Sequence, residues 1–220
     1  MSESGMERPG NRSLDMAALR GLAHPLRVRM LDILSTYGPQ TASSLAERLA
    51  ESSGVTSYHL RQLAQHDFIR EVKGRGTARE RWWERVPGGI SVDTATLPST
   101  AAARSANAIV MSEWHRNREA LLGDYVRRGE HELSREWIEA SMMSTANARV
   151  TSEQLAELTS ELQRVADEFI DRHRHQFGTD APGTRPVQIQ LSAFPVLDAE
   201  EAPAAGRSAA RGSDTADREE

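Results

Sequence analysis

The stretch that decides the fold runs from Leu45 to Trp83, LAERLAESSGVTSYHLRQLAQHDFIREVKGRGTARERWW. Apolar residues recur at helical spacing in 45–49 and again in 56–64, and the short polar turn 51–54 separates the two runs. Residues 68–72 and 79–86 then read as strands on either side of the glycine-bearing turn 73–77. The order predicts two helices joined by a tight turn and followed by a β-hairpin.

The residues before this stretch predict two further helices and the start of a third. Residues 14–23 suit a short amphipathic helix with Asp15 in its first turn, where a negative charge favours the helix dipole. Pro25 suits the first turn of a second helix, which Gly38 and Pro39 end. Thr41 caps the next helix, although Ser44 stands where a full capping box has Glu or Gln. Residues 14–88 therefore predict a winged helix-turn-helix, mainly α with a small β-hairpin wing.

The rest of the chain predicts a linker and a helical region. Residues 89–103 read as the linker, and 104–197 as a helical dimerisation or effector region. Helical spacing marks 104–127, 133–148 and 151–175, the last opened by a capping box of Thr151 and Gln154. Alternating apolar residues predict a half-buried terminal strand at 186–195. Residues 1–13 and the acidic tail 198–220 have the composition of disordered segments.

Composition and charge exclude several classes of protein. The absence of cysteine removes disulfides, thiolate metal sites and cysteine nucleophiles. No apolar run is long enough to cross a bilayer, and the N-terminus lacks the order of a signal peptide, so the cytoplasm is the expected location. The net charge of −5 counts mildly against nucleic-acid binding. The distribution of the charge counts in favour of nucleic-acid binding, because residues 68–85 form a basic region with six cations and three acids. The acidic excess lies in residues 198–220, which have seven acids and three arginines.

The helix predicted at about 53–66 has Thr56, Leu60, Leu63 and Ala64 on its inward face and carries candidate binding residues on its outward side. A DNA major groove admits one helix, and polar side chains near the N-terminal half of that helix read base edges there. Two arginines flank the glycine turn of the wing, a shape that can follow a phosphate backbone or enter a narrow minor groove. The helix candidates are Ser53, Val55, Ser57, Tyr58, Arg61 and Gln62, and the wing candidates are Arg75 and Arg79.

Other polar and aromatic residues have plainer interpretations. We expect His59 to pack in the core, and one of Trp82 and Trp83 to point inward while the other points outward. The tryptophans, Met and Phe of the helical region are expected to be helix core rather than a small-molecule pocket; these are Trp114, Trp137, Met142 and Phe169. The histidines at 173 and 175 suit a solvated helix end better than a metal site. No catalytic set and no cofactor motif is found, so an enzyme is not expected.

Three segments together resemble the ArsR-type winged-helix regulators. They are residues 22–34 (LAHPLRVRMLDIL), residues 57–63 (SYHLRQL) and the Gly-Arg-Gly turn 74–76 before two tryptophans. The resemblance covers about residues 14–86. It implies a dimer that binds double-stranded DNA, with Thr56, Ser57, Tyr58, Arg61 and Gln62 facing the bases and Arg75 and Arg79 in the wing.

The chain also departs from that family. Gly54 and Val55 stand where the recognition helix is usually richer in Ser and Thr, and residues 41–50 lack the cysteines of metal-sensing members. The long C-terminal region resembles that of extended relatives in which helices complete the dimer or hold an effector.

The function expected from the sequence is therefore that of a transcriptional regulator. We expect a homodimer that recognises an inverted-repeat operator, with a small-molecule effector left open. The alternative is a winged helix used for protein interaction, which would be indifferent to changes at Arg61 and Arg75.

Overall fold

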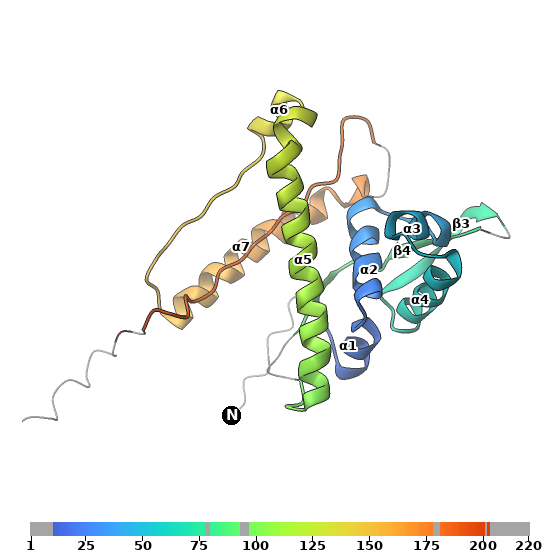
Figure 1. Ribbon diagram of the computed structural model, residues 1–220. Helices are drawn as coiled ribbons and strands as arrows, with labels where there is room; N and C mark the ends of the chain where they lie inside the picture. Colours follow the sequence, from blue (N-terminus) through green and yellow to red (C-terminus); the bar gives the residue numbers. More distant parts are fainter. Residues whose placement is uncertain (1–10, 78–79, 93–96, 178–180, 201, 203–220) are drawn as a thin grey trace, which may run out of the picture.

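The computed structural model describes residues 11–77, 80–92, 97–177, 181–200 and 202 (Figure 1). Its first half contains four helices, α1 (Met16–Leu22), α2 (Pro25–Tyr37), α3 (Ala42–Leu49) and α4 (Ser53–Gln65). A three-stranded antiparallel sheet in the order β2-β4-β3 completes it, with β2 at Gln40–Thr41, β3 at Ile69–Thr77 and β4 at Glu80–Arg85. The predicted winged helix-turn-helix, mainly α with a hairpin wing, is confirmed.

Side-chain caps decide where these helices begin. The Asp15 carboxylate accepts a hydrogen bond of 2.7 Å from the Ala18 amide, so Asp15 is the N-cap of α1 rather than a residue of its first turn. Thr41 Oγ1 accepts from the Ser44 amide at 3.1 Å, and Ser44 Oγ accepts from the Thr41 amide at 3.0 Å. The expectation of an incomplete capping box at Thr41 is therefore wrong, because the shorter serine hydroxyl still reaches the backbone.

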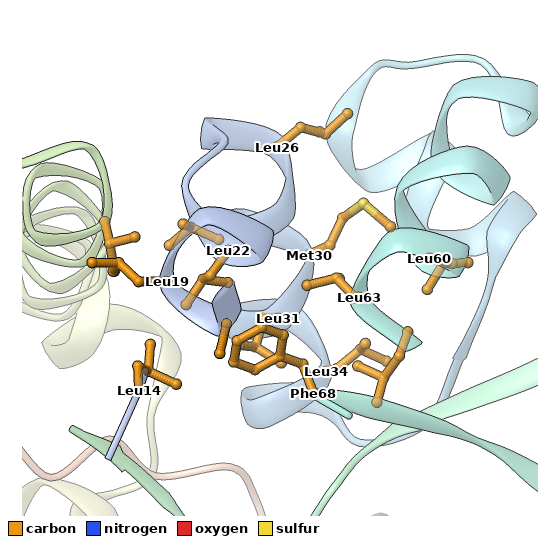
Figure 2. Packing of buried hydrophobic residues seen from close by; sticks show 14 of the residues in the cluster. Leu14, Leu19, Leu22, Leu26, Met30, Leu31, Leu34, Leu60, Leu63 and Phe68 are labelled. Atoms are coloured by element: carbon orange, nitrogen blue, oxygen red, sulfur yellow. The ribbon is translucent and has the colours of Figure 1, made fainter. Parts of the chain in front are cut away.

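A single apolar core joins these elements (Figure 2). Leu19, Leu34, Leu45 and Leu63 come from four different helices, and the solvent reaches none of their side chains. Phe68, just before β3, closes the core against the sheet. At about 25 cal/mol per Å² of apolar area, burial of such side chains is the main force that holds the helices together.

The long helix α5 (Ala101–Glu132) packs on the winged domain by about its first two thirds. Ala103, Ala106, Val110 and Glu113 are buried against α1 and α2. Trp114 also packs on the core, and Asn117 and Leu121 line a cavity beside α2 and α3. The helix continues to Glu132, past the predicted end at 127, and its last part lies away from the winged domain near α6 (Arg135–Glu139), as Figure 1 shows.

A short parallel pair of strands corrects two predicted boundaries. β1 (Asn11–Ser13) pairs with β5 (Gly89–Ser91). Residues 11–13 are therefore ordered, whereas the prediction of disorder for 1–10 lies outside the described residues. The predicted linker 89–103 likewise contains β5 and the start of α5. The two strands lie about 78 positions apart in the chain, so no local sequence pattern indicates that they pair.

The C-terminal part differs most from the prediction. The helix expected at 133–148 is reduced to α6, and 140–151 are irregular. α7 (Ser152–Arg172) has the predicted capping box of Thr151 and Gln154, and a 3-10 turn, Arg174–Gln176, follows it. The strand expected at 186–195 is absent, because that backbone pairs with no other segment among the described residues. The disordered tail predicted for 198–220 lies almost wholly outside those residues.

None of the described helices combines the length and the hydropathy needed to cross a bilayer.

Candidate nucleic-acid interface

A tight turn sets α4 against α3. Ala50 ends α3 in the left-handed region, at φ 54°, and the Glu51 amide donates to the Ala46 carbonyl at 2.9 Å. Ser52 then caps α4, since its hydroxyl accepts from the Val55 amide at 3.2 Å. α4 packs on α1, α2, α3 and β3, and Figure 1 shows it on the side of the domain away from α5.

The outer face of α4 is open to solvent and carries no acid. Ser53, Tyr58 and Arg61 are exposed, and Val55 is exposed over 38 % of its surface. Ser57 and Gln62 are half-buried. Neither Asp nor Glu occurs between Ser53 and Gln65, so nothing on the helix itself repels a phosphate.

Two of these polar side chains are held by their own helix. Arg61 Nε donates to the Ser57 carbonyl at 3.2 Å, and Gln62 Nε2 donates to Gln65 Oε1 at 3.1 Å. Both bonds are exposed and link residues one turn apart, so they are easily exchanged for bonds to a ligand.

Thr56 and His59 lie on the inward side of α4. Thr56 is fully buried and its hydroxyl donates to the Ala42 carbonyl at 2.8 Å. The inward position read from helical spacing is confirmed, and the base-facing role implied by resemblance is wrong for Thr56. His59 is buried as expected, with its ring 4.4 Å from that of His24. Burial, followed by the charges of His24 and Arg27, lowers the pKa of His59, so the imidazole is largely neutral near pH 7.

The structure describes one of the two predicted wing arginines. The turn predicted at 73–77 is wrong, because these residues belong to β3, whose pairing with β4 shifts register between Glu71 and Gly76. Within this strand Gly74 and Gly76 adopt positive φ values of 77° and 97°, which glycine allows without strain. The Arg75 guanidinium lies over the Trp82 ring at 3.8 Å from its centroid, a cation–π contact that holds the exposed arginine. Trp83 packs against the core, so one tryptophan points in and the other out, as predicted. Arg79 lies outside the described residues.

Acids on the hairpin balance some of its positive charge. Arg70 Nε lies 2.7 Å from Glu84, and Arg81 lies 3.7 Å from Glu71. These pairs reduce the local excess of cations counted in the sequence, so the charge available to a phosphate backbone is concentrated toward the tip of the wing.

Arg27 is a residue near the site that sequence reasoning missed. It lies on α2, half-buried, and its charge interacts with Tyr58 across the interface between α2 and α4. Burial lowers the pKa of its guanidinium, and its Nε has no hydrogen-bond partner. A contact between two helices separated by about thirty residues has no signature in the sequence.

A small cavity of about 210 Å³ opens between α2, α3 and α5, away from the outer face of α4. Asp32, Tyr37, Arg48 and Asn117 are among the residues that line it. Its volume is below the range of pockets that enclose drug-sized ligands. None of the four residues considered for a pocket lines this cavity. Trp114 packs on the core, and Trp137 is half-buried. Met142 and Phe169 are exposed, so the expectation that these two belong to the helix core is wrong.

No group of three or more His, Asp or Glu side chains in the described part of the chain is placed to hold a metal ion.

Comparison with known proteins identifies residues 22–72 as a helix-turn-helix domain, which is the description of the family model that matches there. No curated protein sequence matches the chain. Solved structures similar to it include the adhesin competence repressor AdcR from Streptococcus pyogenes, at 19% identity over 52% of this chain and 70% of that one, with a TM-score of 0.29.

Two more solved structures show a likeness of the same order. ZitR from Lactococcus lactis matches at 15% identity over 67% of this chain and 83% of that one, with a TM-score of 0.30. RV1404 from Mycobacterium tuberculosis matches at 18% identity over 60% and 86%, with a TM-score of 0.28. Since such TM-scores leave the overall arrangements different, the helix-turn-helix domain at residues 22–72 is what the comparisons establish.

Proposed function

We propose that this protein is a DNA-binding transcriptional regulator that recognises an inverted-repeat operator as a homodimer in the cytoplasm. The observation that carries the proposal is the outer face of α4. It is exposed and free of acids, and it belongs to a domain that matches a helix-turn-helix family and carries an exposed arginine on its wing. A helix of this kind enters the major groove while a wing follows the adjacent backbone.

Each exposed side chain has a chemical role in this proposal. Arg61 donates to guanine or phosphate, and Gln62 pairs with adenine once its bond to Gln65 is exchanged. Val55 contacts a thymine methyl group, and Tyr58 donates its hydroxyl to a phosphate or a base edge. Arg75 contacts the backbone or a narrow minor groove, and Arg79 is proposed for the same role from the sequence alone. Ser53 and Ser57 contact phosphate.

The exposed surface of the chain supports a dimer. A compact protein of 24.3 kDa exposes about 10,000 Å², whereas this chain exposes 17425 Å². Assigning the residues outside the described ranges the full area of an extended chain, about 5,600 Å², leaves an excess of about 1,800 Å² over the compact protein. Obligate dimers bury about 1,000 to 2,500 Å² on each chain, so a second copy accounts for an excess of this size.

The apolar surface that a second copy would cover lies on α5 and α7. α7 has no buried residue, and one side of it exposes a row of large apolar residues: Leu158, Leu162, Val165, Phe169 and Ile170. Leu122 and Val126 are exposed apolar residues of α5. In a two-fold dimer built on these helices the two copies of α4 would read half-sites about one turn of DNA apart.

Selection of genomic DNA fragments by the purified full-length chain tests the proposal, because the bound fragments themselves reveal the operator. The expected result is enrichment of one motif with inverted-repeat symmetry. Arg61→Ala should cost about 1–3 kcal/mol of binding free energy on that motif and relax its sequence preference. Arg75→Ala should weaken binding to all sequences and reduce the slope of log K against log salt by about 1.

Arg135→Ala is the matched control, because Arg135 is an equally exposed arginine on α6, paired with Glu139 and remote from α4 (Figure 1). It should bind DNA as the wild type does. If Arg61→Ala and Arg75→Ala also bind every fragment as the wild type does, the proposal fails and a winged helix used for protein interaction becomes the better explanation.

A further inference from the structure

Residues 186–195 have the pattern of a strand but none of its pairing. Val187, Ile189 and Leu191 alternate with Gln188 and other uncharged polar residues, as in a strand with one apolar face. In the single chain these three apolar residues are exposed over 69%, 49% and 44% of their surface. Exposure of this apolar face to solvent costs free energy along the whole segment, and contact with another surface would remove that cost.

The backbone of this segment is equally unsatisfied. Between Arg185 and Pro195 no amide or carbonyl makes a backbone hydrogen bond within the described residues. The segment touches the rest of the chain through side chains: Gln190 Nε2 donates to the Arg118 carbonyl at 3.1 Å, and Leu191 and Phe194 border a groove beside Leu162 of α7. Figure 1 shows this orange to red trace passing beside α7. An extended backbone with its amides free is a template for another strand.

The sequence of the segment lacks the features that block such pairing. No charged residue occurs between Arg185 and Asp198, whereas unpaired edges are usually protected by lysine or by inward-pointing charges. Pro186 and Pro195, which cannot donate a ladder hydrogen bond, stand at the two ends and leave eight residues between them. Eight residues without proline are a common strand length.

A second copy of this chain is the occupant that fits. The exposed area of the chain exceeds that of a compact monomer by enough for a dimer interface, and the row of apolar residues on α7 is uncovered beside the same segment. Two identical segments related by a two-fold axis pair antiparallel. A two-stranded ribbon alone is marginal, but one that packs on helices is stable, and the two copies of α7 supply that layer.

We propose that the segments 187–194 of two copies form an antiparallel β-ribbon across the dimer two-fold axis, in which residues 187–191 pair and Ile189 lies opposite Ile189 of the second copy. This register sets Val187 opposite Leu191 and keeps all six apolar side chains on one face of the ribbon, which covers α7. The inference rests on the homodimer of the proposed function, and it specifies the segment that joins the two copies.

Cysteine cross-linking of the full-length protein tests the register, because the chain has no cysteine of its own. Ile189→Cys puts two thiols directly opposite each other, where Cα atoms lie about 4.5–5.5 Å apart and a disulfide forms without distortion. Gln188→Cys changes the neighbouring residue, whose copies lie farther apart on the polar face. Val196→Cys changes an exposed residue beyond Pro195.

Under mild oxidation Ile189→Cys should give several-fold more covalent dimer than either control on a denaturing gel without reductant. In the wild type, every second amide of residues 187–191, those that point at the second copy, should exchange with deuterium about ten-fold more slowly above the dimer dissociation constant than below it. Because Ile189 is exposed in the single chain, the substitution leaves the core intact.

Equal cross-linking of the three variants, or unprotected amides in a chain that light scattering shows to be dimeric, would overturn the ribbon. A dimer that selects an inverted repeat without these signals would leave the proposed function standing. If position 189 cross-links but the protein selects no DNA motif, the proposed function is refuted and the β-ribbon is still supported.

Discussion

Asp32→Asn should remove a pH dependence from the stability of the fold. Asp32 lies on α2 where α5 crosses it, and its Oδ2 is buried without a hydrogen-bond partner. Burial raises the pKa of this carboxyl to about 7; the charge of Glu113 adds to the increase, and those of Arg85 and Arg118 oppose it. An unfolded chain loses the same proton near a pKa of about 3.9.

The sign and size of the effect follow from that difference. Between pH 4 and pH 7 the unfolded chain has released a proton that the folded chain still holds, so the free energy of unfolding falls as pH rises through this window. Each unit of pKa difference is worth about 1.36 kcal/mol, which limits the full loss to about 4 kcal/mol above pH 7. About 1.5 kcal/mol of it is already lost at pH 5, so the wild type should lose about 2–3 kcal/mol between pH 5 and pH 8.

Asparagine has the shape of aspartate and no charge at either pH. Urea unfolding at a fixed protein concentration, followed by circular dichroism at pH 5, 6.5 and 8, measures the difference between Asp32→Asn and wild type. The variant should gain about 2–3 kcal/mol on the wild type from pH 5 to pH 8. Histidines with lowered pKa values, such as His24 and His59, affect both proteins alike and cancel in the difference.

Asp198→Asn is the control, because it makes the same substitution at an exposed residue near the end of the described chain. A stability difference between Asp32→Asn and wild type that is the same at pH 5 and pH 8, within about 0.5 kcal/mol, would refute the reasoning.

Two further predictions concern the recognition helix and the wing. Thr56→Val should cost about 1–2 kcal/mol of unfolding free energy, since it removes the buried hydroxyl that bonds the Ala42 carbonyl, whereas Ser57→Ala should stay within about 0.5 kcal/mol. Chemical denaturation decides, and equal losses would contradict the inward position of Thr56. Gly76→Ala should speed hydrogen exchange in the wing and weaken DNA binding more than Gly74→Ala, because both have positive φ but only at Gly76 does a Cβ collide with the Glu80 carbonyl. Equal hydrogen exchange and equal DNA binding in the two variants would contradict a role for Gly76 in keeping the wing rigid.

Local signals in the sequence were enough to predict the winged domain. Several signals act within a few residues and can therefore be recognised in the sequence: the caps at Thr41 and Thr151, the proline that opens α2, and the glycines of the wing. Helical spacing likewise placed Leu60 and Leu63 inward and Arg61 outward. The same spacing also predicted that Thr56 points inward, whereas the family resemblance implied that Thr56 faces the bases.

Long-range contacts were beyond that reasoning. Nothing near Asn11 indicates its pairing with Gly89, and nothing near Asp32 indicates that α5 would bury its carboxyl. The effect of burial on a pKa depends on every element packed around the group, and only the folded arrangement supplies them.

The sequence by itself determined the four helices of the winged domain, the presence of its hairpin and the outward face of α4, because caps and apolar periodicity act over a few residues. Only the tertiary structure decided that Thr56 is buried, that Asp32 lies beneath α5, and that the alternating segment 186–195 has no strand to pair with in its own chain. The physical reason is that a strand needs a neighbour and a buried charge needs a covering surface, and the position of both is set by the packing of distant parts of the chain.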